Sequence, residues 1–284
     1  MVQVKGWICL DIDGTITSDP YSIPQGVIDY FIKLQSEGWQ FLFTTGRTFT
    51  FAEKLLRIIP FPYLFSVQNG ADLIEMPERK QVKRSYLPVN TIDRLDQIYH
   101  GQAQDYIVYA GMDVGDFCYF CSDHFSSAMK EHLEILMSLV KEPWQDVDSF
   151  SVLKNKYFPL IKCLGTKEQM QELARRLAST SDLHVTMIKD PLSKNGCYNN
   201  LITSKEASKG EAVEWLRNTA GDDVVFIGAG DDFNDLSLLQ AVDIAIAMIT
   251  APAEVRAYAD IIAQPAEDLG IIQALEQAIQ MQGY

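Results

Sequence analysis

Four short segments of the sequence combine carboxylates, hydroxyls, an amide, glycines and a lysine in a way that could support chemistry. These segments are Asp11-Ile12-Asp13-Gly14-Thr15, Thr44-Thr45-Gly46-Arg47, Ser208-Lys209-Gly210 and Gly230-Asp231-Asp232-Phe233-Asn234-Asp235. If their carboxylates converge on one point, they cannot all remain ionised without a cation. Oxygen ligands of this kind suit Mg²⁺, which takes one or two carboxylates, keeps waters and bridges to substrate phosphate. The residue types therefore indicate metal-assisted chemistry on a phosphate group.

The spacing within the first segment fits a two-step transfer. With a cation present to reduce charge repulsion, one aspartate could attack phosphorus and form an aspartyl-phosphate. A second carboxylate two positions further on could protonate the leaving oxygen and later activate water. Gly14 and Gly46 would let the backbone approach closely and donate N–H groups to the phosphoryl oxygens.

Each segment taken alone also has a purely structural explanation. Asp-x-Asp-Gly after a strand is a common turn, Thr45 could cap the following helix, and Asp231 and Asp235 could favour a helix N-terminus. Lys209 is more informative, because a cation in the first turn of a helix opposes the helix dipole by roughly 0.3–1 kcal/mol. Its unfavourable position suggests a role other than helix stabilisation.

The segments around these residues alternate between strand and helix patterns. Short apolar runs predict strands at Trp7–Leu10, Trp39–Phe43, Tyr63–Val67, Val224–Ile227, Ile244–Ala247 and Ile261–Ala263. Helical patterns begin after Ser22-Ile23-Pro24 and at Ser208, cover 51–59, 235–240 and 253–258, and return at the C-terminus. The order predicts a Rossmann-like, doubly wound parallel α/β sheet. Ligands bind beyond the carboxyl ends of the strands of such a sheet, where the four segments stand.

Residues 84–204 show a different pattern. Strand patterns at Tyr106–Tyr109, Phe117–Cys121, Tyr157–Cys163, His184–Met187 and Tyr198–Ile202 often follow one another without a helix between them. Helical patterns start at Asn90, Ser126 and Thr166. We therefore expect a core domain from residues 1–83 and 205–284, and an inserted α+β domain from residues 84–204.

Composition excludes several classes of protein. The 284 residues carry 24 basic and 38 acidic side chains, so the net charge is 24 − 38 = −14, which disfavours binding to nucleic acid or to an anionic membrane. No apolar stretch approaches the ~20 residues that span a bilayer. The five cysteines are an odd number in a large chain, so we expect no disulfide framework and a cytoplasmic location.

The combined motifs resemble the haloacid dehalogenase (HAD) superfamily of phosphotransferases. Asp11-Ile12-Asp13-Gly14-Thr15 matches the family's first motif, Asp-x-Asp-Gly-Thr, and Thr45 matches the Ser/Thr of the second. Thr45-Gly46-Arg47 and Asn69-Gly70-Ala71 are similar to segments of its Cof-type subfamily.

The later motifs extend the resemblance to the C-terminal part of the chain. Ser208-Lys209-Gly210 resembles the third motif, and residues 230–235 resemble the fourth, Gly-Asp-x-x-Asn-Asp. The Cof-type family carries its cap domain between the second and third motifs, so the resemblance implies that residues 84–204 form a cap that selects the substrate. One departure is Ile249-Thr250, where the family often has Gly-Asn.

The resemblance implies a role for each matching residue. Asp11 would be the nucleophile and a Mg²⁺ ligand, Asp13 the general acid and base with its backbone carbonyl on the metal, and Asp231 the remaining carboxylate ligand. Thr45 and Lys209 would hold the transferring phosphoryl group. Family members that cleave carbon–halogen bonds lack the acid at the position of Asp13, so its presence favours phosphate chemistry.

The other matching residues would bind the substrate or support the site. Gly46, Arg47, Asn69 and Asn234 would lie on the substrate side, with Asn234 on phosphate or on a metal-bound water, and Asp235 would support Lys209 or the metal shell. The expected function is a Mg²⁺-dependent phosphatase for small metabolites such as sugar phosphates or phosphorylated cofactors. The expected partner is such a metabolite, with no nucleic acid or membrane, and the chain is expected to be a monomer or weak dimer.

Three alternatives remain open from the sequence. A phosphotransferase or mutase would pass the phosphoryl group to an alcohol instead of water. A metabolite-binding regulator could keep the fold without catalysis, although the intact set of catalytic motifs argues against it. Cys118, Cys121 and His124 could suggest zinc, but strand positions three apart face opposite sides, which favours buried, unreactive cysteines.

Overall fold

The computed structural model describes residues 4–153, 157–178, 181–190, 193, 196–221 and 224–283. The chain divides into two compact units. The core unit contains Met1–Arg47, Ala52–Arg84 and Ser208–Tyr284, and the inserted unit contains Thr48–Phe51 and Ser85–Ala207.

The core unit is built on an eight-stranded sheet in the order β14-β13-β12-β1-β2-β3-β4-β5. Its strands are β1 (Gly6–Asp11), β2 (Trp39–Thr44), β3 (Tyr63–Val67), β4 (Asp72–Met76), β5 (Lys80–Arg84), β12 (Val225–Gly230), β13 (Ile244–Met248) and β14 (Ile261–Ala263). Neighbours from β14 to β3 are parallel, which confirms the predicted Rossmann-like α/β class.

The antiparallel hairpin β4–β5 extends this sheet and was not predicted. The sequence of β5, Lys-Gln-Val-Lys-Arg, carries a single apolar residue, and its side chains are exposed or half-buried. Its pairing with β4 uses backbone hydrogen bonds, which do not require apolar side chains. The sequence of β5 therefore contains no apolar pattern that would predict a strand.

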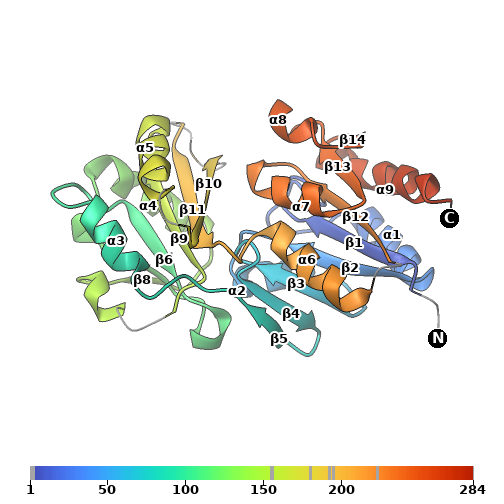
Figure 1. Ribbon diagram of the computed structural model, residues 1–284, viewed down its shortest axis with the longest axis horizontal. Helices are drawn as coiled ribbons and strands as arrows, with labels where there is room; N and C mark the ends of the chain where they lie inside the picture. The colour runs from blue at the N-terminus through green and yellow to red at the C-terminus, as the bar shows by residue number, and fades with distance from the viewer. Residues whose placement is uncertain are drawn as a thin grey trace. The chain divides into compact units, whose positions relative to one another are not determined.

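Helices follow most of the parallel strands (Figure 1). They are α1 (Gln25–Ser36), α2 (Phe49–Leu56), α6 (Lys209–Ala220), α7 (Leu236–Ala241), α8 (Ala253–Arg256) and α9 (Gly270–Met281), with 3₁₀ turns η4 (Phe233–Asp235) and η5 (Ala266–Asp268). The predicted strand after Val224 continues to Gly230, and the helix predicted to reach Tyr258 ends at Arg256.

Both faces of the sheet are covered. Phe31 of α1 packs on Phe41 and Phe43 of β2, with ring centroids 5.1 and 5.9 Å apart. On the other face, Val213 and Leu216 of α6 belong to a buried cluster that includes residues of β1, β2 and β12. Near-continuous apolar strands are the expected consequence of burial on two sides.

The inserted unit contains a six-stranded sheet in the order β10-β11-β9-β6-β7-β8. Its strands are β6 (Tyr106–Tyr109), β7 (Cys118–Phe120), β8 (Trp144–Asp146), β9 (Leu160–Gly165), β10 (Leu183–Lys189) and β11 (Tyr198–Ser204). Its helices are α3 (Thr91–Ile98), α4 (Ser127–Leu139) and α5 (Lys167–Leu177), with 3₁₀ turns η1 (Met112–Val114), η2 (Ser122–His124) and η3 (Phe150–Leu153). All strand pairs except β7–β8 are antiparallel, so this unit is α+β.

The cysteines of the chain serve packing. Cys118 lies in the apolar cluster that includes Leu133 of α4, whereas Cys121 lies in the cluster that includes Leu95 of α3. The two side chains thus belong to different cores, as the strand pattern predicted. All five cysteines are buried and free, and no helix among the described residues is long and apolar enough to cross a bilayer.

Phe41→Ala tests the packing between α1 and β2. Phe41 is fully buried and contacts the rings of Phe31, Phe43 and Phe61, so its truncation should lower the free energy of unfolding by about 3–5 kcal/mol. Urea denaturation measures this loss, and Ile32→Ala on the exposed side of α1 should change it by less than about 0.5 kcal/mol. Equal effects of the two substitutions would contradict the packing described.

Candidate active site

The carboxyl ends of three adjacent strands bring the predicted residues together. In the sheet, β1 lies between β12 and β2, and Asp11 at the end of β1 pairs in register with Thr44 at the end of β2. Strand β12 ends at Gly230, so Asp231 follows at the same edge. All ten sequence-predicted site residues belong to the core unit.

The ammonium group of Lys209 lies between two buried carboxylates. Its Nζ donates to Oδ1 of Asp11 and, at 2.5 Å, to Oδ1 of Asp235. Lys209 is 1% exposed, Asp11 4% and Asp235 0%. Lys209 is the first residue of α6, whose N-cap Ser208 accepts a hydrogen bond from the backbone N–H of Glu211. The N-cap hydrogen bond of Ser208 fixes the first turn of α6, and this turn directs the Lys209 side chain toward Asp11 and Asp235.

Asp235 is fully used by the protein itself. While Oδ1 accepts from Lys209, Oδ2 accepts from the backbone N–H groups of Asp231 and Asp232 at 2.9 and 3.0 Å. Gly230 makes room for this arrangement, because a Cβ at that position would lie 2.4 Å from Cβ of Asp235. Asp235 therefore holds both the lysine and the loop that carries Asp231.

Gly14 has a steric reason to be glycine. Its φ is +79°, and a Cβ would lie 2.1 Å from Oδ2 of Asp231, so a side chain would displace that carboxylate. Its N–H donates to the carbonyl of Thr17 at 2.8 Å. The expectation that this N–H binds a phosphoryl oxygen is wrong, because the turn already uses it. A Cβ on Gly46 would lie 3.4 Å from Oδ1 of Asn69, an ordinary van der Waals distance. Steric contacts within the protein therefore do not require glycine at position 46.

Thr45, Asn69 and Asn234 form a second group at the same edge. Asn69 adopts a positive φ of 55°, its backbone N–H donates to the carbonyl of Thr45 at 2.9 Å, and its Oδ1 accepts from Nδ2 of Asn234 at 3.0 Å. The hydroxyl of Thr45 accepts from the N–H of Arg47 at 3.1 Å. The loops after β2, β3 and β12 thus hold one another in place.

Arg47 contacts Asp13. Its Nε donates to Oδ2 of Asp13 at 2.8 Å, its Nη2 pairs with Oδ1, and its Nη1 donates to the carbonyl of Pro20 at 2.8 Å. The side chain of Arg47 is 9% exposed and that of Asp13 51%. Arg47 therefore orients Asp13 in the substrate-free protein. The resemblance did not imply this role, and a contact between residues so far apart leaves no signal in the sequence.

The charges of the cluster strongly affect one another. Burial, followed by the charge of Asp235, raises the pKa of Asp11 to about 7. Burial, followed by the charges of Asp11 and Asp235, raises the pKa of Asp231 to about 9. Burial would lower the pKa of Lys209, but the two carboxylates outweigh it and raise that pKa above its ordinary value. The lysine is thus a permanent cation, whereas the carboxylates need a further positive charge to ionise fully.

The cluster offers ligands for such a cation. Asp11, Asp231 and Asp235 each place an oxygen within 4.8 Å of the others. Oδ2 of Asp11 is buried and has no hydrogen-bond partner among the described residues. A buried carboxylate oxygen without a donor is costly unless a cation satisfies it, so the donor set fits a divalent metal held by Asp11 and Asp231.

The fold and this acidic edge define a Rossmann-like α/β enzyme whose site lies beyond the carboxyl ends of its strands. The sequence profile described as haloacid dehalogenase-like hydrolase matches residues 8–275. The chain therefore belongs to the haloacid dehalogenase-like hydrolase family, as the motifs suggested.

Known proteins agree with this assignment. The chain is 23% identical over 272 residues to the Bacillus subtilis protein named "Putative phosphatase YkrA", covering 95% of this chain and 96% of that one. A solved B. subtilis haloacid dehalogenase-like hydrolase superposes with a TM-score of 0.76 at 19% identity, over 95% and 99% of the two chains. The HAD subclass IIB sugar phosphatase BT4131 superposes with a TM-score of 0.72 at 19% identity, over 96% and 98%. These structures establish a shared fold.

Metal affinity should increase with pH. Since the pKa values of Asp11 and Asp231 are raised to about 7 and about 9, protons compete with a cation for both carboxylates, and Mg²⁺ should bind more tightly as pH rises from about 6 to about 9. The metal-free folded protein also binds more protons than the unfolded chain in this range, so it should lose stability as pH rises.

Isothermal titration calorimetry and thermal unfolding, each with and without Mg²⁺, measure the two effects. Asp231→Asn should reduce the pH dependence of both. A Mg²⁺ affinity that does not change with pH would contradict the proton competition.

Proposed function

We propose that this protein is a Mg²⁺-dependent phosphatase that hydrolyses small phosphorylated metabolites through an aspartyl-phosphate on Asp11. The arrangement of Asp11 carries the proposal. One of its oxygens is held by Lys209, and the other is buried without a partner beside Asp231. This carboxylate is fixed in position and has an oxygen that the protein itself leaves unused.

The metal would be held by the carboxylates of Asp11 and Asp231 and by the backbone carbonyl of Asp13. When bound, Mg²⁺ would neutralise the repulsion between Asp11 and a phosphate dianion. Asp235 would not be a third ligand, because both of its oxygens already accept hydrogen bonds.

In the first step, a carboxylate oxygen of Asp11 attacks phosphorus and the ester P–O bond breaks. Asp13 gives its proton to the leaving alcohol. Lys209 and Thr45 stabilise the charge of the transferring phosphoryl group. Gly46, Asn69 and Asn234 face the substrate. Arg47 binds the Asp13 carboxylate in the absence of substrate, and Asp13 takes up its proton when this two-bond pairing opens.

In the second step, Asp13 takes a proton from water as the water oxygen attacks the same phosphorus. The bond between phosphorus and Asp11 breaks, which releases inorganic phosphate and restores the Asp11 carboxylate. Atoms and charges balance over the two steps, since Asp13 returns to its protonated form.

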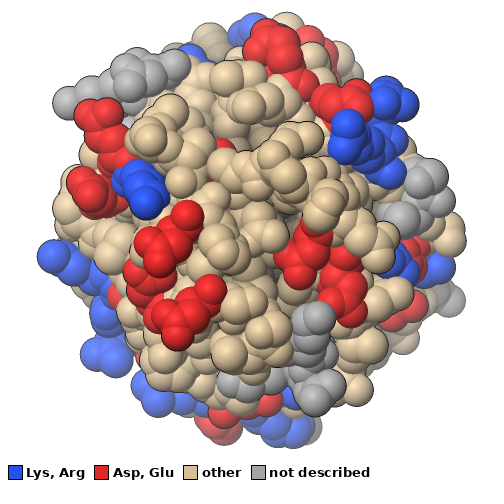
Figure 2. Space-filling model, turned by 90° about the vertical axis from the view of Figure 1, so that its left-hand side faces the viewer, with Lys and Arg blue, Asp and Glu red and all other residues tan. Residues whose placement is uncertain are grey.

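We further propose that the inserted unit is the cap that selects the leaving group, because the chain enters and leaves it between the second and third motifs. Small substrates also suit the charge of the protein. The net charge is −14, and Figure 2 shows Asp and Glu side chains gathered in several groups on one face. Such a surface repels a polyphosphate chain, whereas a local lysine and a metal can still attract one phosphate group.

Asp11→Asn should abolish turnover. The amide is a poor nucleophile and a weaker metal ligand, so p-nitrophenyl phosphate hydrolysis in Mg²⁺ should fall by about 10⁴-fold or more. Omitting Mg²⁺ should have a similar effect on the wild type. Asp29→Asn, an exposed acid on α1, serves as the matched control and should keep full activity. Equal activities of wild type and Asp11→Asn would refute the nucleophile assignment.

Asp13→Asn should slow the enzyme in a way that depends on the leaving group. An alkyl phosphate needs protonation of its leaving oxygen, so its first step should slow by about 10²–10⁴-fold. A p-nitrophenolate ion leaves without a proton, so the first step with p-nitrophenyl phosphate should be much less affected. Single-turnover kinetics with both substrates measure the difference. An identical loss of rate for both would exclude Asp13 as the general acid.

A further inference from the structure

A cavity lies in the core unit, near the amino end of β3 and away from the carboxylate cluster. Its volume is about 340 Å³, and it is lined by Glu53, Leu56, Arg57, Ile59, Pro60, Phe61, Pro62, Tyr63, Met76, Pro77 and Arg79. These residues come from the end of α2, from the loop that leads into β3 and from the turn between β4 and β5. The proposed mechanism uses none of them.

The cavity is separate from the proposed phosphoryl site. Tyr63 is the first residue of β3, whereas Ser66 near the end of that strand pairs with Thr44 at the catalytic edge. From Tyr63 to Val67 the strand advances by roughly 13 Å. A molecule in this cavity would therefore bind at the amino ends of the strands, away from Asp11.

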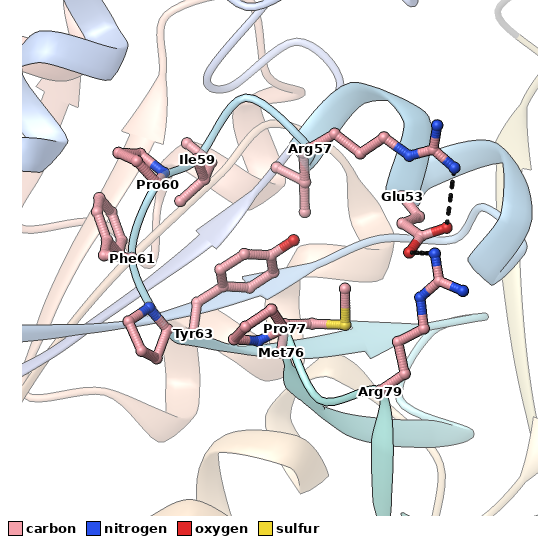
Figure 3. Close-up of a pocket in the computed structure, with 11 residues that line it drawn as sticks. Glu53, Arg57, Ile59, Pro60, Phe61, Tyr63, Met76, Pro77 and Arg79 are labelled. Carbon is pink, nitrogen blue, oxygen red and sulfur yellow. Dashed lines mark ion pairs between the residues drawn. The ribbon is translucent and has the colours of Figure 1, made fainter.

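One side of the cavity is apolar. The side chains of Pro60, Phe61, Tyr63, Met76 and Pro77 surround the space in Figure 3. Proline and aromatic side chains have few rotatable bonds, so they form a wall that loses little conformational entropy when a ligand packs against it. The volume lies near the lower end of the ~300–1,000 Å³ range of small-molecule sites.

The Tyr63 hydroxyl is the polar group inside this wall. Tyr63 is 8% exposed, and Figure 3 shows its hydroxyl directed away from Phe61, toward the side where Arg57 and Glu53 lie. No hydrogen bond to this hydroxyl occurs within the part of the chain that the structure describes. A neutral phenol is a hydrogen-bond donor, so Tyr63 directs a donor without a protein partner into the cavity.

Two guanidinium groups flank the same side. Glu53 is buried, and its Oε1 pairs with Nη2 of Arg79 at 2.6 Å while its Oε2 lies 3.7 Å from Nη2 of Arg57. The Arg57 side chain lies beyond hydrogen-bond distance of Glu53, so its guanidinium donors can bind a second anion at this end of the cavity.

We propose that this cavity binds a small organic carboxylate with an aromatic or apolar body. The carboxylate would accept from the Tyr63 hydroxyl and face Arg57, and the apolar body would pack against Phe61 and the prolines. The apolar wall selects for the body of this ligand, and the positive charge selects for its carboxylate. A neutral aromatic compound would lack the second interaction, and an inorganic anion would lack the first.

Benzoate is the probe for this site. With about nine non-hydrogen atoms, it should bind with a Kd of about 1 mM or tighter. In ¹H–¹⁵N NMR spectra of the full chain, it should shift the amide signals of Ile59, Phe61, Tyr63 and Arg79. Benzamide, which has the same shape without the charge, should bind about tenfold more weakly. Inorganic phosphate should leave these signals unchanged.

Three variants separate local recognition from general electrostatics. Arg57→Gln should weaken benzoate binding about tenfold, and Tyr63→Phe should weaken it several-fold while keeping the ring in place. Lys54→Gln removes one positive charge from α2, at an exposed position outside the cavity, and should have no effect. The proposal is overturned if benzoate shifts none of these signals, if benzamide binds equally well, or if Lys54→Gln weakens binding as much as Arg57→Gln.

Discussion

The buried ammonium group of Lys209 between Asp11 and Asp235 is the interaction on which the rest of the site depends. Removing three charged groups from water costs several kcal/mol for each ion, and the mutual attraction offsets this cost only when the geometry is good and the other lone pairs are satisfied. Asp235 meets this condition through two backbone N–H groups. Asp11 does not, because its Oδ2 has no partner among the described residues. The hydrogen bonds of Asp235 are therefore complete, whereas Asp11 keeps one oxygen that a cation could bind.

The sheet explains how residues so far apart in sequence form this network. Parallel strands β12, β1 and β2 are neighbours, so the loops after them emerge at one edge. The glycines allow the final approach, since a side chain on Gly14 would meet Asp231 and one on Gly230 would meet Asp235. The fold therefore positions the carboxylates, and the absence of side chains at two positions lets them come together.

Much of the fold and of the site could be predicted from the sequence, because both leave local signals. Buried parallel strands produce apolar runs, and polar residues directly after those runs mark the ligand-binding edge. Contacts between distant segments leave no such signal. The pairing of Arg47 with Asp13 depends on how two loops meet, and the N–H of Gly14 is used by a turn of the same loop. The hairpin strand β5 was missed because its pairing depends on the backbone and its sequence is polar.

The carboxylate site proposed at Tyr63 is separate from the catalytic edge, and the central claim concerns Asp11. A crystal structure of the protein with Mg²⁺ and vanadate tests that claim most directly, because vanadate adopts the geometry of a phosphoryl group under attack. We expect vanadium bonded to a carboxylate oxygen of Asp11, with Mg²⁺ on the carboxylates of Asp11 and Asp231 and with Lys209 still paired to Asp235. Vanadate bound without contact to Asp11, or Mg²⁺ bound away from Asp231, would contradict the account.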